Sequence, residues 1–280
     1  MRSSRDGRRR GRPVLRRPEA PARAACRSGP IRALAVDLGS SGARAWVPGR
    51  GLVTVGGAGW DDAGRPVRRG RIVDPESCAG LLGRLADSAL GTHRQDSAVV
   101  LSHPVLAGEE HRALARELLA ALGTSRAVVL NSAGAAAACA GQLGGGPLLV
   151  VDMGAELTEV ALLVGGAVAD ARQADAGLSD LGPGALPGEP VANVLDMITS
   201  MWREDRHGAV RGALRRGPLL TGGGALRRDI TDRIAGRLGV PVRIAPDPST
   251  AVVRGAALIL GSALGPAAGG AASVRPARQR

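Results

Sequence analysis

Two stretches of the sequence repeat one pattern, an apolar run that ends in aspartate, an apolar residue and glycine. The first stretch is LAVDLGSSGARAWV, from Leu34, and the second is LLVVDMGAELTEVALLVGG, from Leu148. At a constant offset, Asp37 aligns with Asp152 and Gly39 with Gly154. Apolar runs of this length that end in small residues are typical of buried strands. The repeat therefore predicts two lobes of related design that face one cleft.

The segments around the repeat alternate between strand and helix patterns, which predicts an α/β fold. We expect a first lobe at 31–143 and a second at 144–262. Two segments rich in Gly and Pro, 48–70 and 178–190, are poor candidates for compact subdomains. The predicted strands lie at 31–37, 43–47, 52–55, 98–101, 127–130, 219–220 and 240–244, with two more within 148–166 that are joined by a tight turn after Asp152. The predicted helices lie at 75–89, 109–122, 133–140, 191–203, 226–238 and 250–260.

The formal net charge of +12 is concentrated at the two ends of the chain. Ten arginines lie in the first 28 residues and three in the last 18, so the span between them is nearly neutral. We expect a disordered arm at 1–30 and a disordered tail at 263–280, both able to attach to an anionic membrane surface. Specific nucleic-acid binding is disfavoured, because aromatic residues are only 1% of the chain and none interleave with the arginines for base stacking.

Three cysteines without paired spacing, Cys26, Cys78 and Cys139, indicate neither a disulfide framework nor a zinc site. No apolar run reaches the length of a membrane span, and the arginines of the arm are not followed by the apolar segment of a secretory signal. These observations favour a cytoplasmic protein. The four histidines lack metal-ligand spacing and are expected at the surface.

Three turns of the sequence are predicted to meet at one ligand. Asp37 and Asp152 end their strands, where two carboxylates suit a divalent cation held largely through its waters. Small residues after the strands would let backbone N–H groups approach a polyphosphate. A run of glycines would let a flat nucleoside lie against bare backbone. The candidate phosphate residues are Gly39, Ser40, Ser41, Gly42, Gly154 and Thr158, and the candidate nucleoside residues are Gly222, Gly223 and Gly224.

Four motifs, in this order along the chain, resemble those of the actin-like ATPase superfamily and, within it, the bacterial MreB-like proteins. They are DLGSSG from Asp37, VDMGAELTEVA from Val151, LLTGGGALRRDI from Leu219 and PVRIAPDPSTAVVRGAALIL from Pro241. The resemblance implies two actin-like (ribonuclease-H-like) lobes with ATP and Mg²⁺ in the cleft between them, the cation at Asp37 and Asp152. It also implies a bacterial cytoskeletal role in cell shape, with self-association or a protein of the cell-wall or division machinery as partner.

The chain departs from the MreB-like pattern at three places. The outer subdomains are reduced to 48–70 and 178–190. The second phosphate loop, which reads Gly-Gly-Gly-Thr-Thr-Glu in the family, has Ala155, Glu156 and Leu157 in its middle, and Glu156 would put a negative charge beside the phosphates. The family's water-activating glutamate is replaced in Asn131-Ser132-Ala133, so no catalytic residue is assigned and at most weak ATPase activity is expected.

Two further readings of the sequence remain open at this point. One is a scaffold that keeps the two-lobed fold without using nucleotide and docks to a membrane surface or a protein partner. A melting temperature that Mg·ATP leaves unchanged would favour it. The other, a sugar-kinase-like enzyme, is disfavoured because neither lobe keeps an insertion that would bind an acceptor.

Overall fold

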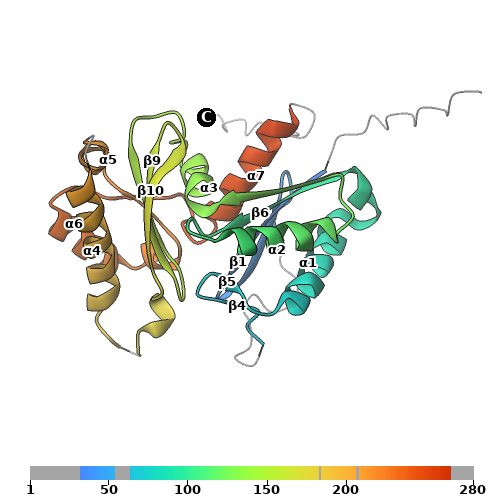
Figure 1. Cartoon of the computed structure of the whole chain (residues 1–280), viewed down its shortest axis with the longest axis horizontal. Coiled ribbons are helices and arrows are strands. Elements are labelled where there is room, and N and C mark those ends of the chain that lie inside the picture. The colour runs from blue at the N-terminus through green and yellow to red at the C-terminus, as the bar shows by residue number, and fades with distance from the viewer. Residues whose placement is uncertain (1–31, 54–63, 183, 206–207, 266–280) are drawn as a thin grey trace, which may run out of the picture.

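The computed structural model describes residues 32–53, 64–182, 184–205 and 208–265, which form two α/β lobes (Figure 1). Each lobe contains one five-stranded sheet. The first sheet has the spatial order β3 (Gly51–Val53), β2 (Gly42–Val47), β1 (Arg32–Gly39), β6 (Ser97–His103), β7 (Arg126–Asn131). The second has the order β10 (Ala167–Ala174), β9 (Thr158–Val164), β8 (Leu148–Met153), β11 (Leu219–Thr221), β12 (Arg243–Ile244). The two sheets share one topology, as the sequence repeat predicts.

The repeated strands β1 and β8 occupy the centre of their sheets. Each pairs antiparallel with the next strand of the chain and parallel with its other neighbour, β6 or β11. Across these hairpins Asp37 lies opposite Arg44, and Asp152 lies opposite Glu159. The same register in both lobes therefore brings an aspartate to the same end of each central strand.

The outer faces of the two sheets are covered by different sets of helices. In the first lobe, α1 (Pro75–Leu90) and α2 (Glu109–Ala120) pack on apolar side chains of β1 and β6 such as Leu34 and Leu101. The α1 helix begins where Asp74 accepts a hydrogen bond from the Ser77 N–H and Pro75 takes the first turn. In the second lobe, the outer face carries α4 (Gly188–Glu204), α5 (Ala209–Arg216) and α6 (Arg228–Leu238).

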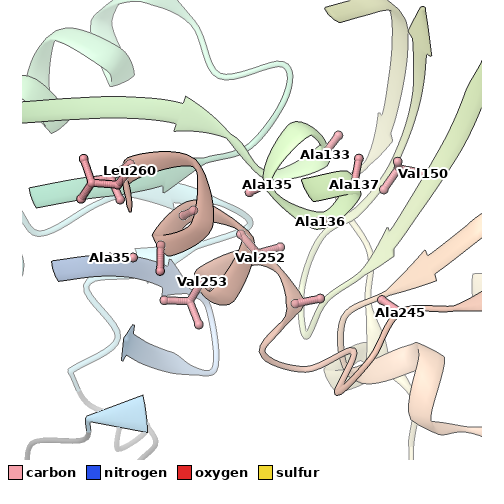
Figure 2. Close-up of a cluster of buried hydrophobic side chains, with 14 of the residues drawn as sticks. Ala35, Ala133, Ala135, Ala136, Ala137, Val150, Ala245, Val252, Val253 and Leu260 are labelled. Carbon is pink, nitrogen blue, oxygen red and sulfur yellow. The ribbon is translucent and has the colours of Figure 1, made fainter. Parts of the chain in front are cut away.

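Two helices rich in small residues, α3 (Ser132–Cys139) and α7 (Ala251–Leu264), lie between the lobes (Figure 1). They pack against each other, and their buried side chains join residues of both sheets in one apolar cluster (Figure 2). Gly255 makes this close approach possible, because a Cβ there would lie 1.7 Å from the Ala135 carbonyl oxygen. Although α7 follows the second sheet in the chain, it also packs on β1 and β6 of the first.

Several elements differ from the prediction. β10 and α5 were not expected. The helix predicted from Leu226 begins at Arg228, after the 3-10 turn η3 (Gly223–Leu226). The 48–70 segment contains β3 and β4 (Val67–Arg68). β4 forms a hairpin with β5 (Arg71–Ile72), which directly follows the segment. The remaining short elements are the 3-10 turns η1 (Gly91–Asp96) and η2 (Leu178–Asp180).

The predicted arm at 1–30 and most of the tail at 263–280 lie outside the described residues, although α7 extends to Leu264. The lobe boundaries at 31–143 and 144–262 stay predictions. Within the described ranges, every helix is too short or too polar to cross a membrane.

Candidate functional site

A cavity of about 320 Å³ lies between the lobes, where β1 and β8 end. Its walls include the loops that follow these two strands, the end of β6, the first residue of α3, and the glycine turn after β11. The segment before α7 completes the lining with Pro248 and Ser249. A cavity of this size falls at the lower end of the range for small-molecule sites.

The structure brings most of the predicted binding residues to this cavity. Those that line it are Asp37, Gly39, Ser40, Ser41, Asp152, Gly154, Gly222 and Gly223. The other three are not among the lining residues. Gly42 is the first residue of β2, and Thr158 is buried and donates its hydroxyl to the Ala176 carbonyl at 2.9 Å. Gly224 is packed so closely under Met153 that a Cβ would lie 2.6 Å from the Met153 Cβ.

The two aspartates are held as a close, partly shielded pair. Burial raises the pKa of Asp37, while Arg44 and a 2.9 Å hydrogen bond from the Ser102 hydroxyl oppose the shift. Burial and the neighbouring Asp37 raise the pKa of Asp152 to about 7. Two carboxyl groups that resist simultaneous ionisation would be neutralised by a cation between them.

The residues that line the cavity could supply only some of the ligands of a cation, and the bound molecule and waters would supply the others. Within the described ranges, no group of three or more His, Cys, Asp and Glu side chains is arranged to hold a metal ion. Asp37 and Asp152 supply two carboxylates, so the other ligands of a Mg²⁺ ion would be waters and ligand oxygens, the coordination that this ion prefers.

Arg44 is a site residue that the sequence pattern did not reveal. It lines the cavity and lies opposite Asp37 in the β1–β2 hairpin. At the aligned position of the second lobe stands Glu159. The lobes thus place an arginine and a glutamate at related positions, and the register of each hairpin rather than any local motif sets this arrangement.

Glu159 links the two lobes at the inner wall of the cavity. One oxygen of its carboxyl group accepts a hydrogen bond from the Val105 N–H at 2.7 Å, and the other accepts one from the Ser132 hydroxyl at 3.2 Å. Burial and the charge of Asp152 raise the pKa of Glu159 to about 8. The segment Asn131-Ser132-Ala133 stands where the resemblance implies a catalytic glutamate, and the carboxyl group that Ser132 contacts, that of Glu159, is mostly protonated at neutral pH.

The asparagine before Ser132 has a structural role. Asn131 caps α3 by accepting a hydrogen bond from the Gly134 N–H at 2.7 Å. The expectation of surface histidines is wrong for His103, which is buried at the end of β6 and lines the cavity, where burial lowers its pKa.

Glu156 belongs to the cavity wall, and its charge is compensated by a short hairpin from the first lobe. We call residues 65–72 the strap, since they contain β4, β5 and the turn between them. The Glu156 side chain is 8% exposed, and its carboxylate lies 3.0 Å from the Arg65 guanidinium and accepts a 3.0 Å hydrogen bond from the Arg69 N–H. The uncompensated charge that the sequence suggests is therefore paired in this structure.

Comparison with known proteins shows which proteins share this fold. Residues 186–264 match the family model of the MreB/Mbl protein. MreB5 of Spiroplasma citri bound to ADP aligns with a TM-score of 0.69 and 16% identity, over 84% of this chain and 97% of that one. The chain has the fold of the MreB proteins. MreB5 bound to AMPPNP aligns with a TM-score of 0.66 and 17% identity, over 83% of this chain and 97% of that one.

A protein whose structure was solved as a filament also has this fold. The MamK double helical filament aligns with a TM-score of 0.64 and 17% identity, over 82% of this chain and 98% of that one. None of the curated proteins compared with the chain matches it in sequence. The family match at 186–264 includes the glycine turn and α7 but neither aspartate loop, in agreement with the departures seen in the second of those loops.

Proposed function

We propose that this MreB-like protein binds ATP with Mg²⁺ between its lobes and acts in the cytoplasm as a cytoskeletal protein of cell shape or cell-wall organisation. The observation that carries this proposal is the convergence of Asp37, Asp152 and three small-residue turns on one cavity. The structures of MreB5 with ADP and AMPPNP support it, since they have the same fold.

Different residues of the cavity would contact different parts of the ligand, according to their chemistry. Asp37 and Asp152 would hold Mg²⁺, which supplies positive charge for the phosphates. Backbone N–H groups of the loops that contain Ser40 and Gly154 would bind the phosphates, and Gly222 and Gly223 would lie beside the nucleoside. Binding of the cation would lower the pKa of Asp152 and release a proton.

Hydrolysis is expected to be slow. The Ser132 hydroxyl is not a base at neutral pH, and Glu159 keeps its proton up to a pKa of about 8. Neither Ser132 nor Glu159 is therefore an ionised base ready to activate water at neutral pH, and nucleotide would act mainly as a bound ligand.

Self-association is the partner interaction that this fold supports best. The structure of MamK as a double helical filament shows that a protein with this fold assembles along a filament. For this chain, sedimentation with and without Mg·ATP measures assembly directly. The arginine-rich ends would add attachment to an anionic membrane surface.

The second candidate function is a scaffold that does not use nucleotide. The strap favours it, because this hairpin connects the two lobes through contacts of Arg65 and the Arg69 N–H with Glu156, all made within the chain. Such a scaffold would keep one arrangement of its two lobes. It would bind a protein of the cell-wall or division machinery, or a membrane.

Calorimetry with Mg·ATP separates the two functions. Saturable heat that is lost in Asp152→Ala would support nucleotide binding, with circular dichroism to show that the variant is folded. No heat up to millimolar Mg·ATP would contradict the nucleotide proposal and leave the scaffold.

A further inference from the structure

The strap is anchored in the first lobe, where Val67 and Ile72 join the apolar core, and its tip reaches across to the second lobe. Arg69 bonds Asp180 at 3.2 Å and also donates to the carbonyl of Asp175, and Arg71 lies 3.8 Å from the Asp175 carboxylate. These pairs are partly exposed, so they orient the strap and add little to stability. They nevertheless fix where its tip sits, over the two loops that follow β1 and β8.

The tip is a two-residue turn whose adjacent N–H groups bond two residues that line the cavity, Glu156 and Ser40. Arg69 and Gly70 have φ angles of +47° and +71°, as in the tight turns that suit the twist of a hairpin. The Arg69 N–H donates to Glu156, and the Gly70 N–H donates to the Ser40 hydroxyl at 3.4 Å. Gly70 fits closely, because a Cβ there would lie 2.7 Å from the Leu157 side chain.

Glu156 is thus surrounded by the donors that proteins use for phosphate groups. A guanidinium and a backbone N–H bond its carboxylate, and the Arg68 Nε lies 3.6 Å away. The same donor types bind phosphate oxygens with charge-assisted hydrogen bonds. Glu156 also lies two residues after Gly154, in the loop that would receive the phosphates, and both line the cavity.

We infer that the Glu156 carboxylate holds the place of a ligand phosphate, and that the strap donors pass from Glu156 to the terminal phosphate of the nucleotide when it binds. The inference rests on the proposed function and names the residue that sets its affinity. Glu156 competes for Arg65 and the Arg69 N–H, and it repels the polyphosphate. Adenosine carries no phosphate, so Glu156 does not compete with it.

The test compares Mg·ATP and adenosine binding to the full chain by calorimetry. Removing one like charge near a polyphosphate is expected to tighten Mg·ATP binding to Glu156→Gln by about tenfold or more, with adenosine binding unchanged. Adding Arg65→Gln should remove most of this gain. Glu117→Gln replaces an exposed glutamate of α2 and should bind both ligands as the unaltered protein does.

Each outcome decides between the two proposals. If the unaltered protein binds Mg·ATP and Glu156→Gln binds it no more tightly, the inference is overturned and the proposed function stands. If only Glu156→Gln binds, the inference is supported and the unaltered protein acts as a scaffold. Absence of binding to either overturns both. Should Glu156→Gln fail to fold, Arg65→Gln alone decides, since it must weaken Mg·ATP binding severalfold and leave adenosine binding unchanged.

Discussion

Asp37, Asp152 and Glu159 are three acidic residues whose carboxyl groups the fold shields from water. Burial raises the pKa of all three, and the repulsion of a neighbouring aspartate adds to the shift for Asp152, to about 7, and for Glu159, to about 8. The folded protein therefore holds protons that the unfolded chain has already released above about pH 5. Folding stability must fall as the pH rises through this window.

Without ligand, we expect the free energy of unfolding to decrease by on the order of 5 kcal/mol between about pH 5.5 and pH 8.5, as the pKa values of Asp152 and Glu159 imply. Urea titrations at a series of pH values measure it. In Glu159→Gln, the free energy of unfolding should fall less steeply with pH. The variant should be more stable than the unaltered protein at the higher pH, because a neutral amide can keep the hydrogen bonds to Val105 and Ser132. A stability that rises with pH over this range would contradict the assignment.

At this residue scale, the sequence predicts the groups that lie within a motif and misses those that come from elsewhere. Asp37, Asp152 and the glycines after β11 follow from strand-end patterns. Arg44 depends on hairpin register. The pairing of Arg65 with Glu156 joins positions 91 residues apart, and no local pattern contains that information.

At the scale of elements, the contact between α3 and α7 depends on one glycine. A Cβ at Gly255 would enter the backbone of α3, so Gly255→Ala must separate the helices and is expected to cost about 3 kcal/mol or more. Thermal unfolding measures the loss. Gly261→Ala in the same helix is the matched control, because a Cβ there meets nothing within 4 Å and alanine favours the helix by up to about 1 kcal/mol. Equal effects of the two substitutions would rule out this packing.

The strap hairpin requires glycine for a different reason. Gly70→Ala places a side chain at positive φ and against Leu157 and Pro104. We expect trypsin to cleave this variant after the strap arginines several times faster than the unaltered protein, with the global melting temperature changed by only a few degrees. Gly83→Ala, with open space on α1, is the control. Unchanged cleavage would mean that the tip does not fasten the strap.

Among the elements, the helices that cover the first sheet with a buried apolar face were predicted. The edge strand β10 and the short helix α5 were not. α1 and α2 show apolar residues at helical spacing above the first sheet. β10 is an edge strand with no fully buried residue, so its apolar pattern is weak. α5 is amphipathic, but it has only eight residues with two buried, so its pattern is too short to stand out in the sequence.

At the scale of the whole molecule, the two lobes share one apolar cluster. Ala35 of the first sheet and Val150 of the second both join α3 and α7 in it. We therefore expect one cooperative unfolding transition in calorimetry, with equal calorimetric and van't Hoff enthalpies. Two separate transitions would contradict this coupling. The internal repeat predicts two matching sheets, but it does not predict that the last helix returns to the first, because small apolar residues suit many partners.

The return of α7 to the first sheet also has a consequence for synthesis. Ala33, Ala35, Ala98 and Val100 are covered in part by α7, the last element that the structure describes. At ordinary rates of translation, the chain between β6 and α7 takes roughly 7–30 s to make. Throughout that time the first lobe stays unfinished on the ribosome, with an apolar face open to chaperones. This protein completes its fold only when nearly all of its described chain has been translated.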